Sequence, residues 1–341
     1  MRNIFTLLVI SAIFLFFINI IFVIYHFVIW STEGIHAVFQ GMSLSENVYY
    51  STYFKWIILS DVVWTIGLII FVFKRKQYKT DIDLYYLIQK PIINPKICVI
   101  IPTFNEELGI KQVVEDYIKQ KNVEYVYVID NHSSDNTVKI AEKCGATVFT
   151  KKNNEGFAHS CVMGLQKALQ TDANIVVLTE ADGTYSGADL KKMVPYLDNT
   201  DMVVGSREIQ VLSEKGNQNK MLYLWGNFLL AKLVQIKFFS LQHMGVISLT
   251  DIGCSYRCIR REALEKIITQ FLDLKTGEIL VKPKSGLFAP FTTMLGIKND
   301  LRIVEVPITF KKRIGISKTE SDKKDKALGY ALEFFWFILR S

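Results

Sequence analysis

The stretch VLTEADGTY, Val177 to Tyr185, joins an apolar run to two carboxylates, Glu180 and Asp182, and then to a glycine. The run Ile175–Thr179 predicts a buried strand that ends at these acids. Burying bare carboxylates costs free energy unless a cation or hydrogen-bond donors compensate. Oxygen ligands of this kind suit Mg²⁺ or Mn²⁺ bridged to substrate phosphates. We therefore expect Glu180 and Asp182 to hold a metal ion, with a purely structural role for the acids as the alternative.

Working outward from this strand, apolar runs alternate with helical stretches over the middle of the chain. The other predicted strands are Ile97–Pro102, Tyr125–Asp130, Ala146–Thr150 and Met202–Gly205, and the predicted helices are Glu106–Gln120, Ser134–Cys144, Glu155–Gln170 and Ala188–Leu197. Regular alternation with short joins predicts an α/β fold with a mostly parallel, doubly wound sheet and helices on both faces. In such sheets ligands bind beyond the carboxyl ends of the strands.

Further acids follow the first two predicted strands. Pro102 ends the first strand, Asn105 is expected to cap the next helix, and Glu106 opens it; capping alone would explain this acid. Asp130 closes the second strand, where its carboxylate could accept hydrogen bonds from a nucleotide base or ribose. The sequence contains neither GxGxxG nor GxxxxGK[ST], so a Rossmann fingerprint and a P-loop are excluded.

Composition narrows the class of protein. The chain has 341 residues, of which 50% are hydrophobic, and a net charge of +7. A modest basic excess suits an anionic membrane face or phosphorylated ligands, whereas the clustered basic stripe of a nucleic-acid-binding protein is missing. The five cysteines and five histidines are scattered, which argues against a zinc site or a disulfide framework.

Two apolar runs near the N-terminus, residues 4–30 and 56–73, predict a two-helix transmembrane hairpin, with two buried core helices as the alternative. Lys74, Arg75 and Lys76 follow the second run, while the loop between the runs carries no lysine or arginine before Lys55. The positive-inside rule therefore predicts a multi-pass cell-membrane protein with its catalytic domain in the cytoplasm. We expect a membrane anchor over residues 1–76, a linker over 77–95, a catalytic domain over 96–318 and a charged, amphipathic tail over 319–341.

Two later segments combine apolar and basic residues. Gln218–Phe239 has apolar residues on one helical face, which fits either a helix packed at the edge of the sheet or an interfacial helix on a bilayer. The tail Ala327–Leu339 is too short to span a membrane, and we expect it to lie at the interface or to pack against the anchor.

Seven motifs, in order, resemble those of the family 2 glycosyltransferases of the GT-A fold, in particular the polyprenyl-phosphate sugar transferases. They are VIIPTFNEE, YVIDNHSSDNT, NEGFAHSCVMG, TEADGTY, VVGSR, TDIGCSYRCIRREAL and EVPITFKKRIGISK, and together they cover residues 96–318. Each motif alone is weak, but seven in the family's order are a strong signal. The resemblance implies a GT-A domain and a UDP- or GDP-sugar donor.

The resemblance also implies roles for individual residues. Glu180 and Asp182 match the metal-binding DxD motif, with glutamate in place of the first aspartate, which leaves open which carboxylate touches the metal. The residues implied to bind the nucleotide-sugar are Pro102, Phe104, Glu106, Asp130, Glu180, Arg313 and Lys318; those implied at the acceptor are Arg207, Ser255 and Arg257; those implied in catalysis are Asp182, Asp251 and Arg207.

The implied chemistry is inverting transfer to a membrane lipid, with polyprenyl phosphate favoured as acceptor, for cell-envelope glycan synthesis. An anionic lipid phosphate needs no general base; a sugar hydroxyl would need one, and Asp251 is the candidate, unless it only caps a turn. Transfer to a lipid-linked glycan or a diacylglycerol-type lipid is the first alternative. A non-catalytic membrane scaffold with the same fold is the second, and metal-dependent nucleotide binding would discriminate between enzyme and scaffold. Processive synthases are disfavoured because QxxRW is missing.

Overall fold

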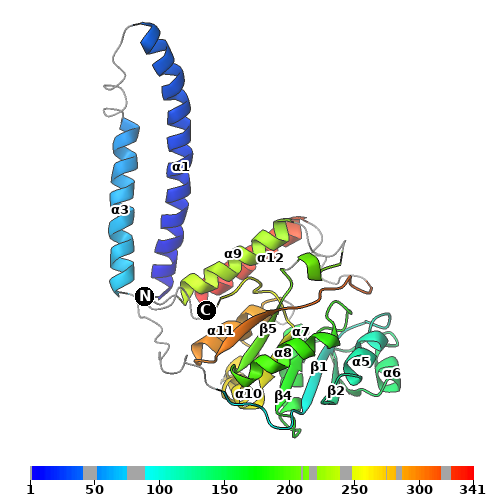
Figure 1. The fold of residues 1–341 in the computed structure, drawn as a ribbon. Coiled ribbons are helices and arrows are strands. Elements are labelled where there is room, and N and C mark those ends of the chain that lie inside the picture. The colour runs from blue at the N-terminus through cyan, green and yellow to red at the C-terminus, as the bar shows by residue number, and fades with distance from the viewer. Residues whose placement is uncertain are drawn as a thin grey trace. The chain divides into compact units, whose positions relative to one another are not determined.

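The computed structural model of the chain describes residues 2–40, 52–74, 89–208, 210–214, 221–238, 248–273, 275–281, 286–315 and 324–341. The chain divides into two compact units, Met1–Gln77 and Tyr78–Leu339 (Figure 1). The first unit is helical, and the second contains the sheet and the residues of interest for catalysis.

In the first unit, helices α1 (Arg2–Phe39) and α3 (Thr52–Lys74) lie side by side. Asn19 donates hydrogen bonds to Ser60 Oγ at 2.7 Å and to Asp61 Oδ1 at 2.9 Å, and the ring of Phe16 stacks on that of Trp64. Two helices were expected here as a transmembrane hairpin. Among the residues that the structure describes, no helix is long and apolar enough to cross a membrane, so that part of the expectation is not confirmed.

The second unit is built on a seven-stranded sheet with the order β3-β2-β1-β4-β6-β5-β7. The strands are β1 (Ile97–Thr103), β2 (Val123–Asp130), β3 (Thr147–Thr150), β4 (Ile175–Leu178), β5 (Met202–Ser206), β6 (Arg257–Arg260) and β7 (Ile303–Pro307). β6 pairs antiparallel with both β4 and β5, and the other pairings are parallel. The predicted mostly parallel α/β sheet is confirmed, and the five strands predicted from apolar runs are all present.

The reversed direction of β6 decides which segments meet. The carboxyl ends of the parallel strands share one edge of the sheet, where ligands of α/β proteins bind. Since β6 runs the other way, its amino end lies on this same edge, between the carboxyl ends of β4 and β5. The segment before Arg257 therefore meets the segments that follow β4 and β5.

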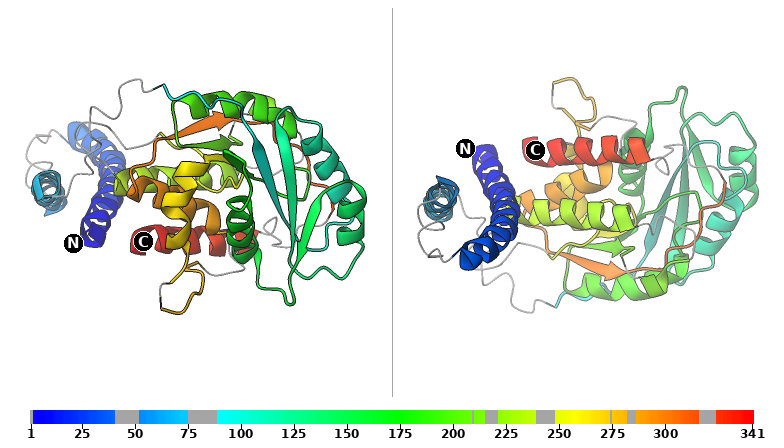
Figure 2. Two further views of the ribbon diagram at one scale, coloured as in Figure 1. Left: turned by 90° about the horizontal axis from the view of Figure 1, so that it is seen from below. Right: turned by 90° about the horizontal axis from the view of Figure 1, so that it is seen from above.

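Helices cover both faces of the sheet (Figure 2). On one face lie α5 (Ile110–Ile118), α6 (Thr137–Lys143) and α8 (Leu190–Met193); on the other lie α7 (Phe157–Ala168), α10 (Arg261–Ile267) and α11 (Phe288–Lys298). In α5 the buried residues Ile110, Val113, Val114 and Tyr117 follow the three-and-four spacing of a helix with one apolar face. On α7, a Cβ at Gly164 would lie 2.2 Å from Ile100 Cγ2, so only glycine permits this close approach.

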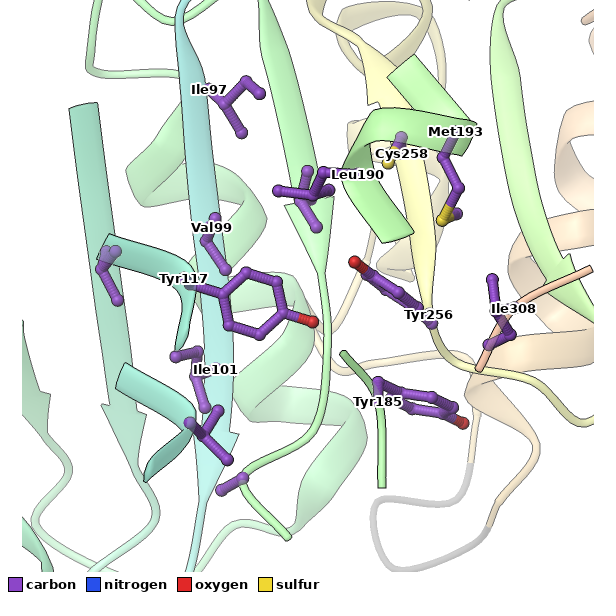
Figure 3. Packing of buried hydrophobic residues seen from close by; sticks show 14 of the residues in the cluster. Ile97, Val99, Ile101, Tyr117, Tyr185, Leu190, Met193, Tyr256, Cys258 and Ile308 are labelled. Carbon is purple, nitrogen blue, oxygen red and sulfur yellow. The ribbon is translucent and has the colours of Figure 1, made fainter. Parts of the chain in front are cut away.

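Three buried tyrosines connect the core to the carboxyl edge of the sheet (Figure 3). The rings of Tyr185 and Tyr256 stack with centroids 5.2 Å apart, and Tyr117 meets Tyr256 edge-on at 6.2 Å. The Tyr117 hydroxyl lies 2.7 Å from Thr179 Oγ1, and the Tyr256 hydroxyl donates to Ser186 O at 3.1 Å. Buried aromatic rings with satisfied hydroxyls are rigid, so they support the loop that follows β4 from below.

Two more helices of this unit, α9 (Met221–Lys237) and α12 (Lys324–Arg340), contact each other at their carboxyl ends. The buried Lys237 side chain donates to the carbonyl oxygens of Ile338 and Leu339, which satisfies the carboxyl end of α12. α9 buries one face and exposes Trp225 and Leu229. A position at the edge of the sheet or on a bilayer stays a prediction for this helix. The tail prediction was incomplete, because Phe337 of α12 packs against Phe291 of α11 with centroids 6.0 Å apart.

Candidate active site

The acidic turn after β4 lies at the carboxyl edge of the sheet, as predicted. Asp182 is 3% exposed, and its Oδ1 accepts hydrogen bonds from Thr184 N at 3.0 Å and from Thr184 Oγ1 at 2.6 Å. Gly183 adopts a φ of 75°, which is favourable for glycine and costly for other residues. The turn therefore fixes the Asp182 carboxylate before any ligand arrives.

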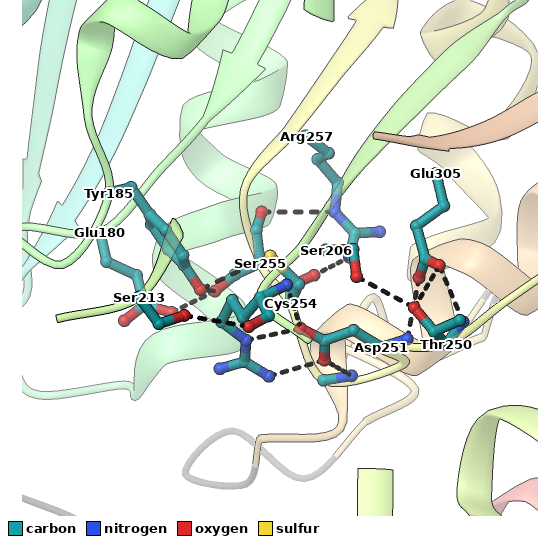
Figure 4. A network of polar contacts seen from close by, with 12 residues as sticks. Glu180, Tyr185, Ser206, Ser213, Thr250, Asp251, Cys254, Ser255, Arg257 and Glu305 are labelled. Carbon is teal, nitrogen blue, oxygen red and sulfur yellow. Dashed lines mark hydrogen bonds and ion pairs between the residues drawn. The ribbon is translucent and has the colours of Figure 1, made fainter. Parts of the chain in front are cut away.

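Glu180, two residues earlier, is half-buried and meets a segment from the other side of the edge. Its Oε1 accepts a short hydrogen bond from Ser255 Oγ, which lies just before β6 (Figure 4). Burial, and then the charge of Asp182, raise the pKa of Glu180 to about 7. A proton or a cation is therefore favoured at this carboxylate when Asp182 is ionised.

Arg313 joins the acidic turn to a third carboxylate. Its Nη1 lies 3.0 Å from Asp182 Oδ2, and its Nη2 lies 3.1 Å from Glu106 Oε1. Arg313 belongs to a segment, Lys311–Gly315, that runs along the turn: Lys311 N donates to Thr184 O and Ile314 N donates to Asp182 O, both at 2.8 Å. One guanidinium therefore bridges the two carboxylates.

The loop that carries Glu106 differs from the expectation. Helix α5 begins at Ile110, not at Glu106, and Asn105 does not cap it. Asn105 has a φ of 52°, and its Oδ1 accepts from Ser134 N at 2.8 Å. Glu106 N donates to Thr137 Oγ1 at 2.8 Å. The loop after β1 is thus tied to the loop after β2, which turns the Glu106 side chain toward Arg313 instead of into a helix.

Asp130 ends β2 beside Thr103 of β1 and is completely buried. Both of its carboxylate oxygens lie 3.2 Å from Ser133 N, so the side chain closes the turn that follows. Pro102 is buried within β1, opposite Ile129, and Phe104 follows that strand at the same edge. Of the predicted nucleotide-binding residues, those after β1, β2 and β4 come from adjacent strand ends, Arg313 comes from the segment after β7, and Lys318 lies outside the described residues.

A second charged pair, Arg207 and Asp251, forms after β5 (Figure 4). Arg207 Nε donates to Asp251 Oδ2 and Arg207 Nη2 donates to Asp251 Oδ1, both at 2.7 Å. Arg207 N adds a bond to Oδ2 at 3.1 Å, and the guanidinium lies 5.4 Å from the centroid of the Phe310 ring. Asp251 is fully buried, and its ionised form raises the pKa of Arg207 against the opposing effect of burial. This is a bidentate pair, the strongest geometry for these groups.

The side chain of Arg257, which we expect to contact the acceptor, is completely buried in this structure. Its Nη2 donates to Cys254 O at 2.7 Å and its Nε to Ser255 O at 3.4 Å. Burial lowers the pKa of Arg257 to about 10. Arg257 therefore holds the backbone of Cys254 and Ser255, and so helps to fix the Ser255 side chain that donates to Glu180.

The donor set fits a divalent cation held together with a diphosphate. Among the described residues, no three Asp, Glu, His or Cys side chains form a group that could hold a metal ion alone. Glu180 and Asp182 supply carboxylate oxygens, and Mg²⁺ is commonly bound by one or two carboxylates plus substrate phosphates. The Arg313 guanidinium already lies against Asp182, which is consistent with a demand for positive charge at this place.

Two residues of this network escaped prediction. Glu305 of β7 accepts from Thr250 N and Asp251 N, both at 2.8 Å, and so holds the loop that carries Asp251. Tyr185 lies 3.5 Å from Ser255 Oγ through its hydroxyl. Each stands inside a motif of the family, but nothing in the spacing indicates that these side chains face the site.

Comparison with known proteins supplies the family. The model of glycosyl transferase family 2 matches residues 98–268, which is half of the chain. The protein is a family 2 glycosyltransferase. The residues matched run from β1 to the end of α10, so they include the acidic turn and the Arg207–Asp251 pair.

Several curated relatives of this glycosyltransferase are named for lipid phosphates. Polyprenol monophosphomannose synthase of Mycolicibacterium smegmatis is 27% identical over 238 residues, covering 67% of this chain and 83% of the relative. Undecaprenyl-phosphate mannosyltransferase of Micrococcus luteus is 26% identical over 234 residues, covering 65% and 87%. UDP-N-acetylglucosamine–dolichyl-phosphate N-acetylglucosaminyltransferase of Methanococcus voltae is 28% identical over 232 residues, covering 62% and 84%.

Among solved structures, the glycosyltransferase is similar to glucosyl-3-phosphoglycerate synthase of Mycobacterium tuberculosis in complex with Mn²⁺, UDP and phosphoglyceric acid. The TM-score is 0.50 at 16% identity, covering 72% of this chain and 78% of that one. This likeness confirms the expected GT-A-like fold.

Proposed function

We propose that this glycosyltransferase moves a sugar from a UDP- or GDP-sugar to a polyprenyl phosphate, with Mg²⁺ or Mn²⁺ and with inversion at the anomeric carbon. The observation that carries the proposal is that a group of carboxylates and a fixed guanidinium lie near each other at one edge of the sheet. Arg313 pairs with Glu106 and Asp182, and Glu180 beside them is near enough to feel the charges of both Arg313 and Arg207, the latter fixed by Asp251. The first group suits a cation with a diphosphate, and the second suits an anionic acceptor.

On the donor side, Asp130 would accept hydrogen bonds from the nucleoside, and Glu180 and Asp182 would hold the cation. When bound, the cation neutralises the charge that develops on the leaving diphosphate. Arg313 would exchange its ion pair with Asp182 for the diphosphate and stabilise the same charge. Lys318 is proposed to assist it, as the resemblance implies.

On the acceptor side, the state of Asp251 favours a phosphate over a hydroxyl. A general base must reach the proton it removes. Asp251 is fully buried, and both of its oxygens accept from Arg207, so it is poorly placed to take a proton from a sugar hydroxyl. An acceptor phosphate is already anionic and would bind Arg207 and Ser255 directly. The lipid phosphates in the names of the relatives support the same choice.

We also propose that the protein acts at the cell membrane, with the sheet-containing unit on the cytoplasmic side. Helices α1 and α3 expose large apolar side chains, among them Phe14, Phe17, Ile21, Trp56 and Val63. Exposed apolar surface of this extent is unfavourable in water and favourable beside lipid. Membrane fractionation of cells, followed by protease treatment of sealed vesicles from either side, tests both statements; a chain recovered in the supernatant would contradict them.

The function itself is tested by a donor screen on the purified full-length protein in detergent. UDP- and GDP-sugars are offered with Mn²⁺ and polyprenyl phosphate, and products are identified by mass spectrometry. We expect one donor to yield a lipid-phosphate sugar, and we expect chelation of the metal to abolish it.

Two other outcomes are informative. Nucleotide binding or donor hydrolysis without a glycolipid would contradict the lipid-phosphate acceptor and favour a lipid-linked glycan or another lipid. Folded protein that binds no nucleotide in the presence of metal would contradict the catalytic proposal and favour a scaffold.

A further inference from the structure

We propose that Glu305 of β7 is a positioning residue for sugar transfer, which holds Asp251 so that Asp251 presents the Arg207 guanidinium to an anionic acceptor. The inference rests on the proposed function, because it assigns Glu305 to the acceptor half of that site. Glu305 acts through Asp251 and is assigned no contact with the substrate.

Glu305 accepts hydrogen bonds from two consecutive residues of the loop that carries Asp251 (Figure 4). Its Oε1 accepts from Asp251 N at 2.8 Å, and its Oε2 accepts from Thr250 N at 2.8 Å and from Thr250 Oγ1 at 2.7 Å. A carboxylate that receives two consecutive backbone N–H groups fixes the peptide between them. The peptide fixed here is the one that leads into Asp251.

Side-chain contacts connect that peptide to Arg207 and to the end of β5. Asp251 forms the bidentate pair with Arg207, and Thr250 Oγ1 lies 2.9 Å from Ser206 Oγ. Glu305 lies opposite Val204 of β5 in the parallel ladder between β5 and β7, and Arg207 directly follows β5. The sheet therefore fixes the distance between Glu305 and the origin of Arg207, and the loop with Asp251 is held between two points of one rigid element.

The Glu305 side chain is a carboxylate in a largely buried position. Burial raises the pKa of Glu305, and hydrogen bonds from Thr250 and Asp251 oppose that rise. Keeping a carboxylate at this depth costs free energy that an apolar residue would not. A carboxylate is the side chain that accepts at both ends. In Glu305→Gln, one end becomes an NH₂ group that faces either Thr250 N or Asp251 N, so the isosteric change breaks the clamp in either orientation.

The test compares Glu305→Gln with wild type in the lipid-phosphate transfer assay. Since the donor is held by other residues, we expect kcat to fall about 30-fold while the KM for the nucleotide-sugar and the Kd for the nucleotide with Mn²⁺ change less than about twofold. Thr250→Val is the second variant, for the case that Glu305→Gln does not fold. It removes one of the three bonds to Glu305 and the contact with Ser206 Oγ, and a kcat loss of about threefold is expected. Glu265→Gln, on the surface of α10, is the control and should leave all three constants unchanged.

A double-mutant cycle separates positioning from general stability. In an Arg207→Lys background the bidentate pair is already lost, so adding Glu305→Gln should lower kcat by less than about threefold more. Full additivity, a parallel loss of nucleotide affinity, or an unchanged kcat in folded Glu305→Gln would each overturn the proposal. If wild type itself transfers no sugar, the proposed function fails; if wild type transfers and Glu305→Gln matches it, only the positioning role fails.

Discussion

Two charged clusters lie at the same edge of the sheet, and they differ in how many carboxylates pair with each guanidinium. Around the acidic turn, the carboxylates of Glu106 and Asp182 pair with one guanidinium, that of Arg313, which is 28% exposed, and Glu180 is near enough to feel its charge. After β5, one carboxylate, Asp251, meets one guanidinium, Arg207, in a bidentate pair held by backbone N–H groups. In the first cluster two carboxylates share one guanidinium, whereas in the second one carboxylate pairs with one guanidinium and the carboxylates of Glu208 and Glu305 lie nearby.

From this difference we expect the first cluster to bind the donor and the second to bind the acceptor. Two buried carboxylates on one guanidinium favour a further cation, which in the proposed function arrives with the donor. A balanced, rigid pair needs no further charge to be stable, so Arg207 is already oriented toward the place that an acceptor would occupy. The two clusters differ most in the role of Arg313. Its charge stabilises the carboxylates of the acidic cluster before the diphosphate is present.

Asp182→Asn should break the first cluster and have the largest effect. The amide keeps the size of the side chain but is a poor ligand for a hard cation, so transfer should fall about a thousandfold or more. The melting temperature should stay close to that of wild type. Transfer activity and thermal unfolding are measured with Asp172→Asn, an exposed residue far from the turn, as the control. Activity within tenfold of wild type would remove the metal-site assignment.

Arg313→Gln should sharpen the comparison with a smaller effect. The change removes the charge that we expect to move from Asp182 to the diphosphate, so the affinity for a nucleoside diphosphate with Mn²⁺ should fall about tenfold. Isothermal titration measures this directly. Lys312→Gln removes a charge from the neighbouring, exposed residue and should have little effect. Equal losses in the two variants would mean that only the net charge of the segment matters.

Glu208→Gln probes the surroundings of the balanced pair and should have the smallest effect. Burial, and then Asp251, raise the pKa of Glu208 to about 7, above the value of about 4.3 expected in the unfolded chain. The folded state therefore binds more protons between these values, and its stability falls as the pH rises through this window. The variant should raise the melting temperature by about 2 °C at about pH 8 and hardly at all at about pH 4. An equal shift at both pH values would contradict the raised pKa.

The local pattern of the sequence predicted most of the sheet and the acids at its edge. The runs around Ile97, Tyr125 and Ile175 are apolar over the length of a strand, and such runs form strands wherever both faces are covered. The start of α5 was predicted wrongly, because Glu106 and Asn105 are acceptable at a helix start. Contacts with Ser133 and Ser134 in the next loop and with Thr137 at the start of α6 instead hold them in a turn.

The partners of the site residues were beyond the reach of the sequence. Arg313 and Glu106 stand 207 positions apart in the chain, and their ion pair depends on the segment after β7 lying along the acidic turn. Arg257 carries the same charge as Arg207 and lies in a motif of the same family, yet only the position of β6 in the sheet decides that its side chain is buried.

The sequence by itself determined that this chain is α/β, that its strands end in carboxylates, and that its motifs are those of family 2 glycosyltransferases. Strand-forming tendency, turn residues and side-chain chemistry are local properties, so short stretches of sequence predict them. The tertiary structure alone decided which charges meet. The reversed β6 brings Ser255 to Glu180, and the β5–β7 ladder brings Glu305 to Asp251. Such meetings depend on the order and direction of strands, which no short stretch of sequence encodes.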